Sequence, residues 1–211
     1  MSVTVINISG MSVTVIRDSY DPRMARWEPG SGSRLEEAAL ELFGTQGFDR
    51  TTVAEIAERA GVTERTFFRH FADKREILFA GARLLQDLLV DEVLESPAGT
   101  SPIEAVRRAL AAAGAFFDDR REYSRYRQAI IVGSEELRER ELIKLATLAA
   151  ALADALRRRG VADPAAALTG ELAIAVFRTA FESWVAEDGP ASLGERCRDA
   201  FEELRVVATD G

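Results

Sequence analysis

Side chains that can donate hydrogen bonds gather in one short stretch, residues 63–74, with the sequence TERTFFRHFADK. Phe67 and Phe71 lie four residues apart, so a helix would place them on one face, where they can pack inward. The other faces of that helix would carry four polar or cationic side chains: Arg65, Thr66, Arg69 and His70. Such a surface suits the major groove of DNA, because the fork of an arginine can bind guanine O6 and N7 together. This stretch therefore predicts a helix that reads DNA, with its two arginines and Thr66 as the candidates for base edges.

The residues before this helix have the spacing of a second, shorter helix joined to it by a tight turn. Thr52 and Glu55 are spaced as a capping box, in which two side chains satisfy the free amides of a helix start. Gly61 ends that helix, because glycine tolerates the left-handed conformation, and Thr63 can cap the next one. An ordinary corner between two helices, with its charges in solvent, has the same pattern. The corner alone therefore does not establish DNA binding.

The run from Ser33 to Ala80 extends this pattern with SRLEEAALELFGTQGFDRTTVAEIAERAGVTERTFFRHFADKREILF, and it resembles the N-terminal domain of TetR-family transcriptional regulators throughout. The resemblance implies that Glu64–Phe71 is the recognition helix. It also implies a set of residues that contact DNA: Thr52, Thr63, Arg65, Thr66, Phe68, Arg69, His70 and Lys74. Within this set, His70 and Lys74 match positions that commonly contact phosphate in the family. Phe68 departs from the family's frequent tyrosine, so a hydroxyl–phosphate bond is excluded there.

Charge is segregated along the chain. The 211 residues carry a net charge of −8, which argues against indiscriminate, charge-driven binding to nucleic acid but not against a localised site. Residues 63–75 are net positive by two, while residues 81–211 carry most of the acid. A compact basic footprint on an acidic body needs close fit to bind. This distribution suits a protein that recognises one double-stranded DNA operator.

The sequence excludes several other classes of protein. The chain has one histidine, His70, and one cysteine, Cys197, in separate predicted domains, so neither a cysteine–histidine nucleophile pair nor an internal disulfide is expected. Zinc-ligand spacings, a P-loop and a Gly-x-Gly-x-x-Gly motif are absent from the sequence. We therefore expect no enzymatic activity, no cofactor and no metal. The lone cysteine and the lack of a secretory signal or membrane-length apolar run predict a cytoplasmic protein with no membrane partner.

The sequence divides into three regions. Residues 1–32 contain MSVTVI twice, at Met1–Ile6 and Met11–Ile16, and the alternating valines hint at strand. Two such short copies cannot build a sheet alone, so we expect a mostly disordered arm. The alternative is that basic residues of the arm reach a minor groove: Arg17, Arg23 and Arg26. Residues 33–80 form the predicted DNA-binding domain, and residues 81–211 form a larger ligand-binding and dimerisation domain.

Helix starts are marked along the whole chain after this arm. Ser33 with Glu36 predicts the start of the first helix, and Asp73 with Glu76 predicts the start of a long helix over 74–95. Later starts are predicted at four places: Ser101–Pro102, Ser134, Asp163–Pro164 and Ser192. The sequence therefore predicts an all-α fold of about nine helices, three in a small DNA-binding head and the rest in a larger bundle.

Dimerisation is expected because a single head offers few contacts, whereas two heads related by a two-fold axis would read a palindrome. The segment from Leu168 to Val185 is apolar on more than one face, so it needs partners on two sides. We predict a homodimer interface on the last two helices, at Leu168, Leu172, Val176, Trp184 and Phe201. A central helix in a monomeric bundle would have the same apolar pattern.

The larger domain is rich in aromatic residues, and the TetR resemblance implies a small-molecule pocket there. The candidate lining residues are Phe116, Phe117, Tyr123, Tyr126, Arg127, Phe177 and Phe181. Any single one of these rings is also explained as ordinary core. We expect an apolar or aromatic effector that acts through the predicted helix 74–95 and releases repression. The alternative function is a helical protein-binding or architectural module without ligand response, in which Arg65 and Arg69 could change without consequence for DNA.

Overall fold

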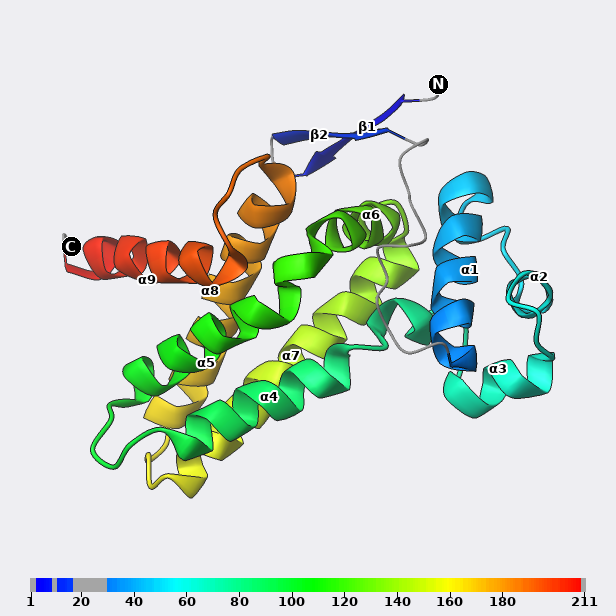
Figure 1. The fold of residues 1–211 in the computed structure, drawn as a ribbon. Coiled ribbons are helices and arrows are strands. Elements are labelled where there is room, and N and C mark those ends of the chain that lie inside the picture. The colour runs from blue at the N-terminus through cyan, green and yellow to red at the C-terminus, as the bar shows by residue number, and fades with distance from the viewer. Residues whose placement is uncertain (1–2, 9–10, 17–29, 210–211) are drawn as a thin grey trace. The chain divides into compact units, whose positions relative to one another are not determined.

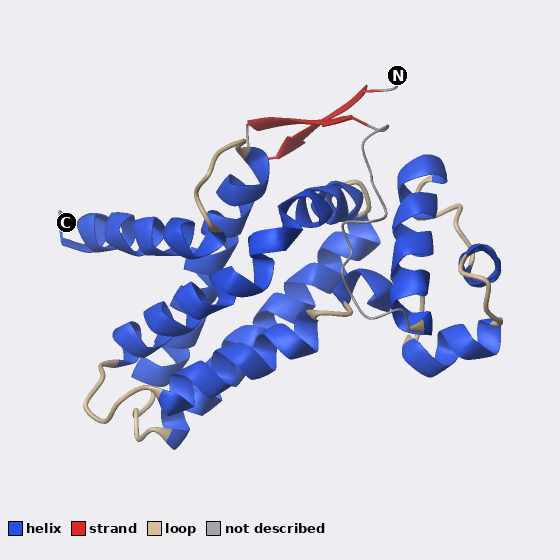
Figure 2. Cartoon of the chain, in the orientation of Figure 1, coloured by secondary structure: helices blue, strands red, loops and turns tan. Residues whose placement is uncertain are grey.

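Nine α-helices make up most of the chain that the structure describes, which comprises residues 3–8, 11–16 and 30–209 (Figure 1). This structure, a computed structural model, confirms the predicted all-α fold and the expected number of helices within those residues. Figure 2 shows strand only in the N-terminal ribbon of the described chain. None of the described helices combines the length and the apolarity that a membrane span needs.

The chain forms two compact units, each of which is described by itself. The first unit comprises Met1–Ala80 and Glu122–Glu141, and the second comprises Gly81–Arg121 and Leu142–Gly211. The chain therefore passes between the units three times. The second passage lies at the start of α6 (Arg121–Val132), and the third lies inside α7 (Glu135–Arg158).

The duplicated N-terminal sequence forms a two-stranded ribbon. Strands β1 (Val3–Ile8) and β2 (Met11–Ile16) pair antiparallel, with Val3 opposite Ile16 and Ile8 opposite Met11. The alternating β-branched residues favour this extended backbone. The continuation of the predicted arm over residues 17–29, with its three arginines, lies outside the described residues.

Three helices form the head of the first unit: α1 (Ser31–Gln46), α2 (Val53–Arg59) and α3 (Glu64–His70). Their apolar faces meet in one core, whose fully buried members include Leu35, Ala39, Ile56 and Phe67. The prediction of three head helices is therefore confirmed. The predicted start of the first helix is wrong, because α1 begins at Ser31 and Gly30 is its N-cap. Ser33 consequently lies inside the first turn, where it cannot act as the cap.

The predicted helix over 74–95 is also wrong. A short 3₁₀ turn, η2 (Glu76–Phe79), is followed by a separate helix, α4 (Ala82–Glu95). Asp73 does cap the turn, because its Oδ1 accepts from the amides of Arg75 at 2.8 Å and Glu76 at 3.2 Å. Three consecutive residues of η2, Ile77–Phe79, are buried. These side chains anchor η2, which packs against α1, and α4 begins only after the turn.

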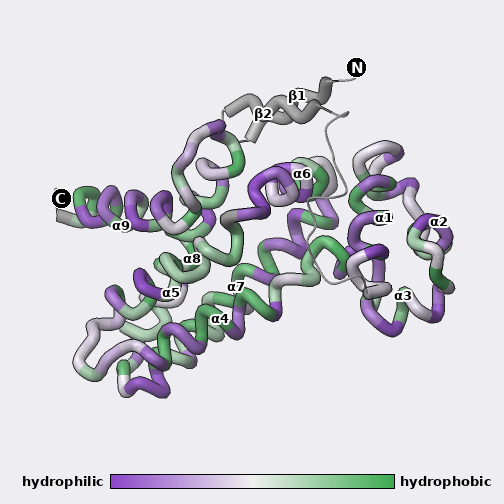
Figure 3. Tube along the Cα trace, viewed as in Figure 1, coloured by the Kyte–Doolittle hydropathy of each residue, from purple (hydrophilic) through white to green (hydrophobic). Residues whose placement is uncertain are grey.

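Helices α4, α5 (Pro102–Phe117), α8 (Ala165–Ala186) and α9 (Leu193–Thr209) form the second unit together with most of α7. The predicted later helix starts are confirmed, and the hydroxyls of Ser101 and Ser192 accept hydrogen bonds from Glu104 and Glu195 amides at 3.3 and 3.2 Å. Figure 3 shows hydrophobic and hydrophilic residues alternating along α9, as in an amphipathic helix. α5 packs against α4, α8 and α9.

Candidate nucleic-acid interface

Local hydrogen bonds hold α2 and α3 as the sequence predicts. The hydroxyl and amide of Thr52 each donate to a Glu55 carboxylate oxygen at 2.8 Å, and the Glu55 amide donates to the Thr52 hydroxyl at 3.2 Å. The two bonds that the Thr52 amide and hydroxyl donate lower the pKa of the Glu55 carboxyl. Gly61 has a φ of 66°, which lets the chain turn between the two helices. Thr63 caps α3 by accepting from the Thr66 amide at 3.2 Å.

α3 buries one face and presents the others. Phe67 is fully buried and Phe71 nearly so, with their ring centroids 5.7 Å apart. Phe68 is 55% exposed, and its ring meets the edge of Phe67. Arg65 and Arg69 are exposed, and within the described chain neither makes a hydrogen bond or an ion pair. Both guanidinium groups therefore keep all their donors available for another molecule.

His70 takes part in a contact within the head. Its Nε2 lies 2.7 Å from the hydroxyl oxygen of Ser31. This bond joins the last residue of α3 to the first residue of α1. The imidazole is exposed, so its other nitrogen, and not the whole ring, remains for the predicted phosphate contact.

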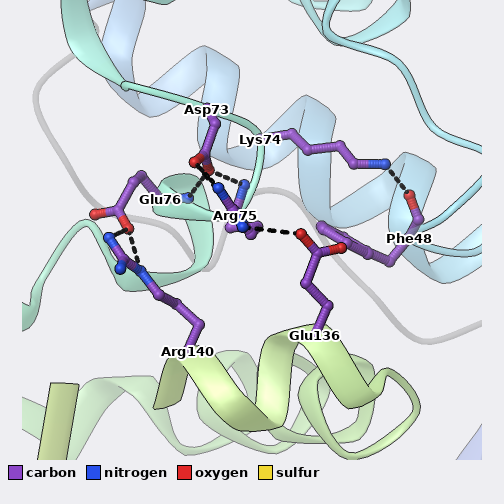
Figure 4. A network of polar contacts seen from close by, with 7 residues as sticks. All are labelled: Phe48, Asp73, Lys74, Arg75, Glu76, Glu136 and Arg140. Carbon is purple, nitrogen blue, oxygen red and sulfur yellow. Dashed lines mark hydrogen bonds and ion pairs between the residues drawn. The ribbon is translucent and has the colours of Figure 1, made fainter. Parts of the chain in front are cut away.

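The ammonium of Lys74 points back into the head (Figure 4). It donates to three main-chain oxygens, those of Phe48 at 2.8 Å, Thr51 at 3.0 Å and Asp49 at 3.3 Å. It also lies 4.3 Å from the centre of the Phe48 ring. The family pattern predicts a phosphate contact for Lys74, whereas in the structure its partners are main-chain oxygens of the same head.

A network of ion pairs surrounds η2 in the first unit, and sequence reasoning missed it. Arg75 pairs with Asp73 at 2.5 Å and with Glu136 of α7 at 2.9 Å, and Glu76 pairs with Arg140 of α7 (Figure 4). The hydrogen bond from Arg75 holds the pKa of the Asp73 carboxyl below its ordinary value. These pairs fix η2 to the first turns of α7.

The predicted ligand residues fall into two groups. Phe117 is the centre of an aromatic cluster in the second unit, with ring centroids of its neighbours 5.0 to 6.1 Å away: Phe116, Phe177, Phe181 and Trp184. The remaining three candidates, Tyr123, Tyr126 and Arg127, lie in the first unit. There Arg127 donates to the carbonyl of Leu78. Tyr126 lies against Gly44 of α1, so closely that a Cβ added to Gly44 would be 1.3 Å from the Tyr126 hydroxyl oxygen. The structure therefore brings four of the seven candidates together in one cluster.

The predicted dimer residues also separate into two groups. Val176, Trp184 and Phe201 are buried in the core of their own chain, so they have little area left to bury against a partner. The apolar faces of α8 are therefore covered in large part by other helices of the same chain. Leu168 is 67% exposed and Leu172 is half-buried, so these two remain accessible on α8.

Comparisons with known proteins agree with this geometry. Residues 35–80 match the family model described as bacterial regulatory proteins, tetR family, and residues 100–208 match the model of the MftR C-terminal domain. MftR of Mycobacterium tuberculosis, named for mycofactocin biosynthesis regulation, is 27% identical over 192 residues, which cover 87% of this chain and 93% of that protein. The HTH-type transcriptional regulator BetI of Rhizobium meliloti is 31% identical over 162 residues, which cover 70% of this chain and 78% of BetI.

A solved structure shares the same architecture. FadR of Thermus thermophilus, a TetR-family transcriptional repressor crystallised in complex with lauroyl-CoA, superposes with a TM-score of 0.52. The two chains are 25% identical, and the match covers 82% of this chain and 93% of FadR.

Proposed function

The chain belongs to the TetR family of transcriptional regulators, and on that premise we propose that it represses transcription by binding a palindromic operator as a homodimer. A small apolar effector would release the protein from the DNA. Both events would take place in the cytoplasm. The observation that carries the DNA-binding half of this proposal is the outward face of α3. There Arg65, Phe68 and Arg69 are exposed, while Phe67 anchors the helix in the core.

The chemistry of this face matches the edges of base pairs. Arg65 and Arg69 spend no donor on another described residue, so either can bind guanine O6 and N7 without first breaking an ion pair. Phe68 presents a ring that can contact a thymine methyl group. Thr63 and Thr66 hold their hydroxyl oxygens 3.1 Å apart at the start of α3. Contacts from these groups to base edges would supply the sequence specificity. The electrostatic attraction between the whole chain and the DNA phosphates is weak, because the chain carries a net charge of −8.

The second unit offers a surface for a second copy. Leu168 of α8 and Val207 of α9 are 67% and 74% exposed, and Val206 is exposed beside the latter. A two-fold pairing of these helices would bury apolar groups that solvent contacts in one chain. Such a dimer would present two α3 helices to successive major grooves, about 34 Å apart or a multiple of that spacing.

The aromatic cluster of the second unit supports an apolar effector. Phe117, Phe177 and Phe181 supply rings that an acyl chain or an aromatic ligand can contact. Since the FadR relative was crystallised with lauroyl-CoA, fatty acyl-CoA is the first class to test. The effect on the head would pass along the three chain passages between the units, two of which are helical. A coupling of about 1–3 kcal/mol is typical and would suffice to lower occupancy of the operator.

The test begins with DNA selected by the protein itself from a random-sequence pool. Fluorescence anisotropy across a salt series then compares the wild type with Arg65→Ala. We expect a loss of about 1–3 kcal/mol and relaxed sequence preference, because a bidentate base contact is removed. The matched control is Arg158→Ala, which removes the same charge from an exposed arginine of the second unit. Failure to enrich any sequence would refute DNA recognition.

The effector is tested separately on the selected duplex. Addition of lauroyl-CoA, with coenzyme A alone as the control, should lower the operator affinity of the wild type. If saturating lauroyl-CoA and a broad screen of apolar compounds leave that affinity unchanged, ligand release is refuted while DNA recognition stands.

A further inference from the structure

Lys74 lies just after α3, yet its side chain reaches the turn that precedes α2. The turn over residues 47–52 connects α1 to α2 and has few internal hydrogen bonds, one of them from the Thr51 amide to the Phe48 carbonyl at 3.2 Å. Phe48 and Thr51 are buried. Carbonyl oxygens of a partly buried turn need donors, and an ammonium group carries three protons. Lys74 supplies those protons to the oxygens of residues 48, 49 and 51.

These bonds join the segment that follows α3 to the turn that precedes α2, so they connect the two ends of the helix–turn–helix. Residues 52–73, which contain α2 and α3, lie between the two ends that Lys74 joins. The next residue, Arg75, does not reach this turn, because its guanidinium pairs with Asp73 and Glu136 (Figure 4). At the C-terminal end of α3 itself, the Ser31–His70 bond holds the helix to α1. Both contacts restrict the orientation of α3 relative to α1.

From this geometry we infer that Lys74 is a positioning residue for DNA recognition: it fixes the orientation of α3 through the turn that precedes α2. A phosphate contact would require the ammonium to leave three oxygens and the Phe48 ring, 4.3 Å from its nitrogen. Hydrogen bonds from a charged donor are about twice as strong as neutral ones, so these bonds hold Lys74 firmly to the turn. The inference rests on the proposed function, because it concerns how the same DNA-binding face is held.

The experiment compares two affinities of Lys74→Met, one for the duplex selected by the wild type and one for random duplex DNA. A misoriented α3 loses base contacts but keeps its charge. We therefore expect about a tenfold loss of affinity for the selected duplex, the factor that 1.4 kcal/mol represents, with random DNA bound as tightly as by the wild type. The salt dependence of random-DNA binding should be unchanged. The control for lost charge is Lys144→Met, in the second unit, which should alter neither affinity.

A direct phosphate contact predicts a different result. Both affinities would then fall alike, and the slope of log K against log salt would lose about 1.8 in magnitude, since each phosphate neutralised contributes about 0.9 and a dimer has two such contacts. A role in stability alone would leave both affinities unchanged well below the melting temperature. Either outcome overturns the inference. Failure of the wild type to prefer its selected duplex would instead overturn the proposed function.

A second variant keeps the test valid if Lys74→Met does not fold. Phe48→Leu leaves the ammonium in place but removes the ring beneath it. A positioning role predicts a smaller loss of preference for the selected duplex in this variant. A phosphate contact predicts no loss, because the charge is retained.

Discussion

Replacement of Gly114 by alanine should destabilise the second unit, although alanine is the better helix former. Gly114 of α5 and Gly194 of α9 are buried where the two helices cross. A Cβ on Gly114 would lie 2.5 Å from the Gly194 amide nitrogen and 2.7 Å from its Cα. The first distance is about 0.9 Å short of the 3.4 Å at which ordinary van der Waals contact begins. Both obstructing atoms are backbone, so no change of rotamer can relieve the clash.

Two opposing effects decide the size of the loss. Alanine in a helix interior is favoured over glycine by roughly 0.5–1 kcal/mol. Overpacking a core typically costs about 1–3 kcal/mol, and the upper part of that range applies because the helices must separate. The separation loosens the α9 residues that pack on this core, Leu193 and Cys197 among them. We expect a net loss of about 2 kcal/mol, which for a chain of this size corresponds to a melting temperature lower by roughly 4–8 °C.

Thermal unfolding followed by circular dichroism measures this shift, with urea unfolding as a check of the free energy. Gly32→Ala is the matched control, since a Cβ there would lie 3.6 Å from the nearest atom, in ordinary contact. That variant should be neutral or slightly more stable. A melting temperature of Gly114→Ala equal to or above that of the wild type would show that α5 and α9 do not cross as closely as described.

Three further predictions concern single side chains. Burial raises the pKa of the Cys197 thiol to about 12, so Ellman's reagent at about pH 8 should leave the native protein unmodified and react once urea unfolds it; rapid reaction of the native protein would contradict this burial. The pKa of Asp73 is lowered by Arg75, so the carboxylate contributes stability above its ordinary value of 3.8 and loses it as the pH falls below that value. Asp73→Asn should therefore be less stable than the wild type at neutral pH and converge with it in acid unfolding; a constant gap would refute the linkage. Leu168→Glu should shift the sedimenting species to the mass of one chain. The melting temperature of that chain should not fall, because Leu168 is exposed in the monomer. An unchanged dimer would exclude this part of α8 from the interface.

Local signals in the sequence predicted local structure well. Thr52 with Glu55 and Ser192 with Glu195 form the reciprocal caps that their spacing indicates, because both partners lie within one turn of helix. Ser33 with Glu36 has the same kind of spacing but is not a cap, since the start of α1 lies upstream of it. A short motif therefore shows where a helix can begin, and the surrounding packing decides where it does.

Contacts between distant parts of the chain could not be predicted in the same way. The pairs Arg75–Glu136 and Glu76–Arg140 join residues 61 and 64 positions apart, and no local pattern marks them. Lys74 binds main-chain oxygens, which every residue carries, so its partners have no signature in the sequence. Apolar periodicity likewise predicted that Trp184 is buried but could not tell a second chain from the core of its own.

The interrupted first unit has a consequence for the order in which the protein is completed during synthesis. Its two parts are separated by residues 81–121, so the partners of η2 are translated only after α4 and α5. Arg75 and Glu76 emerge from the ribosome well before Glu136 and Arg140. A nascent chain that ends at residue 121 already carries every side chain of the α3 face but lacks the ion pairs that fix η2. The head of each newly made molecule therefore acquires its full set of contacts late, when more than half of the chain has been translated.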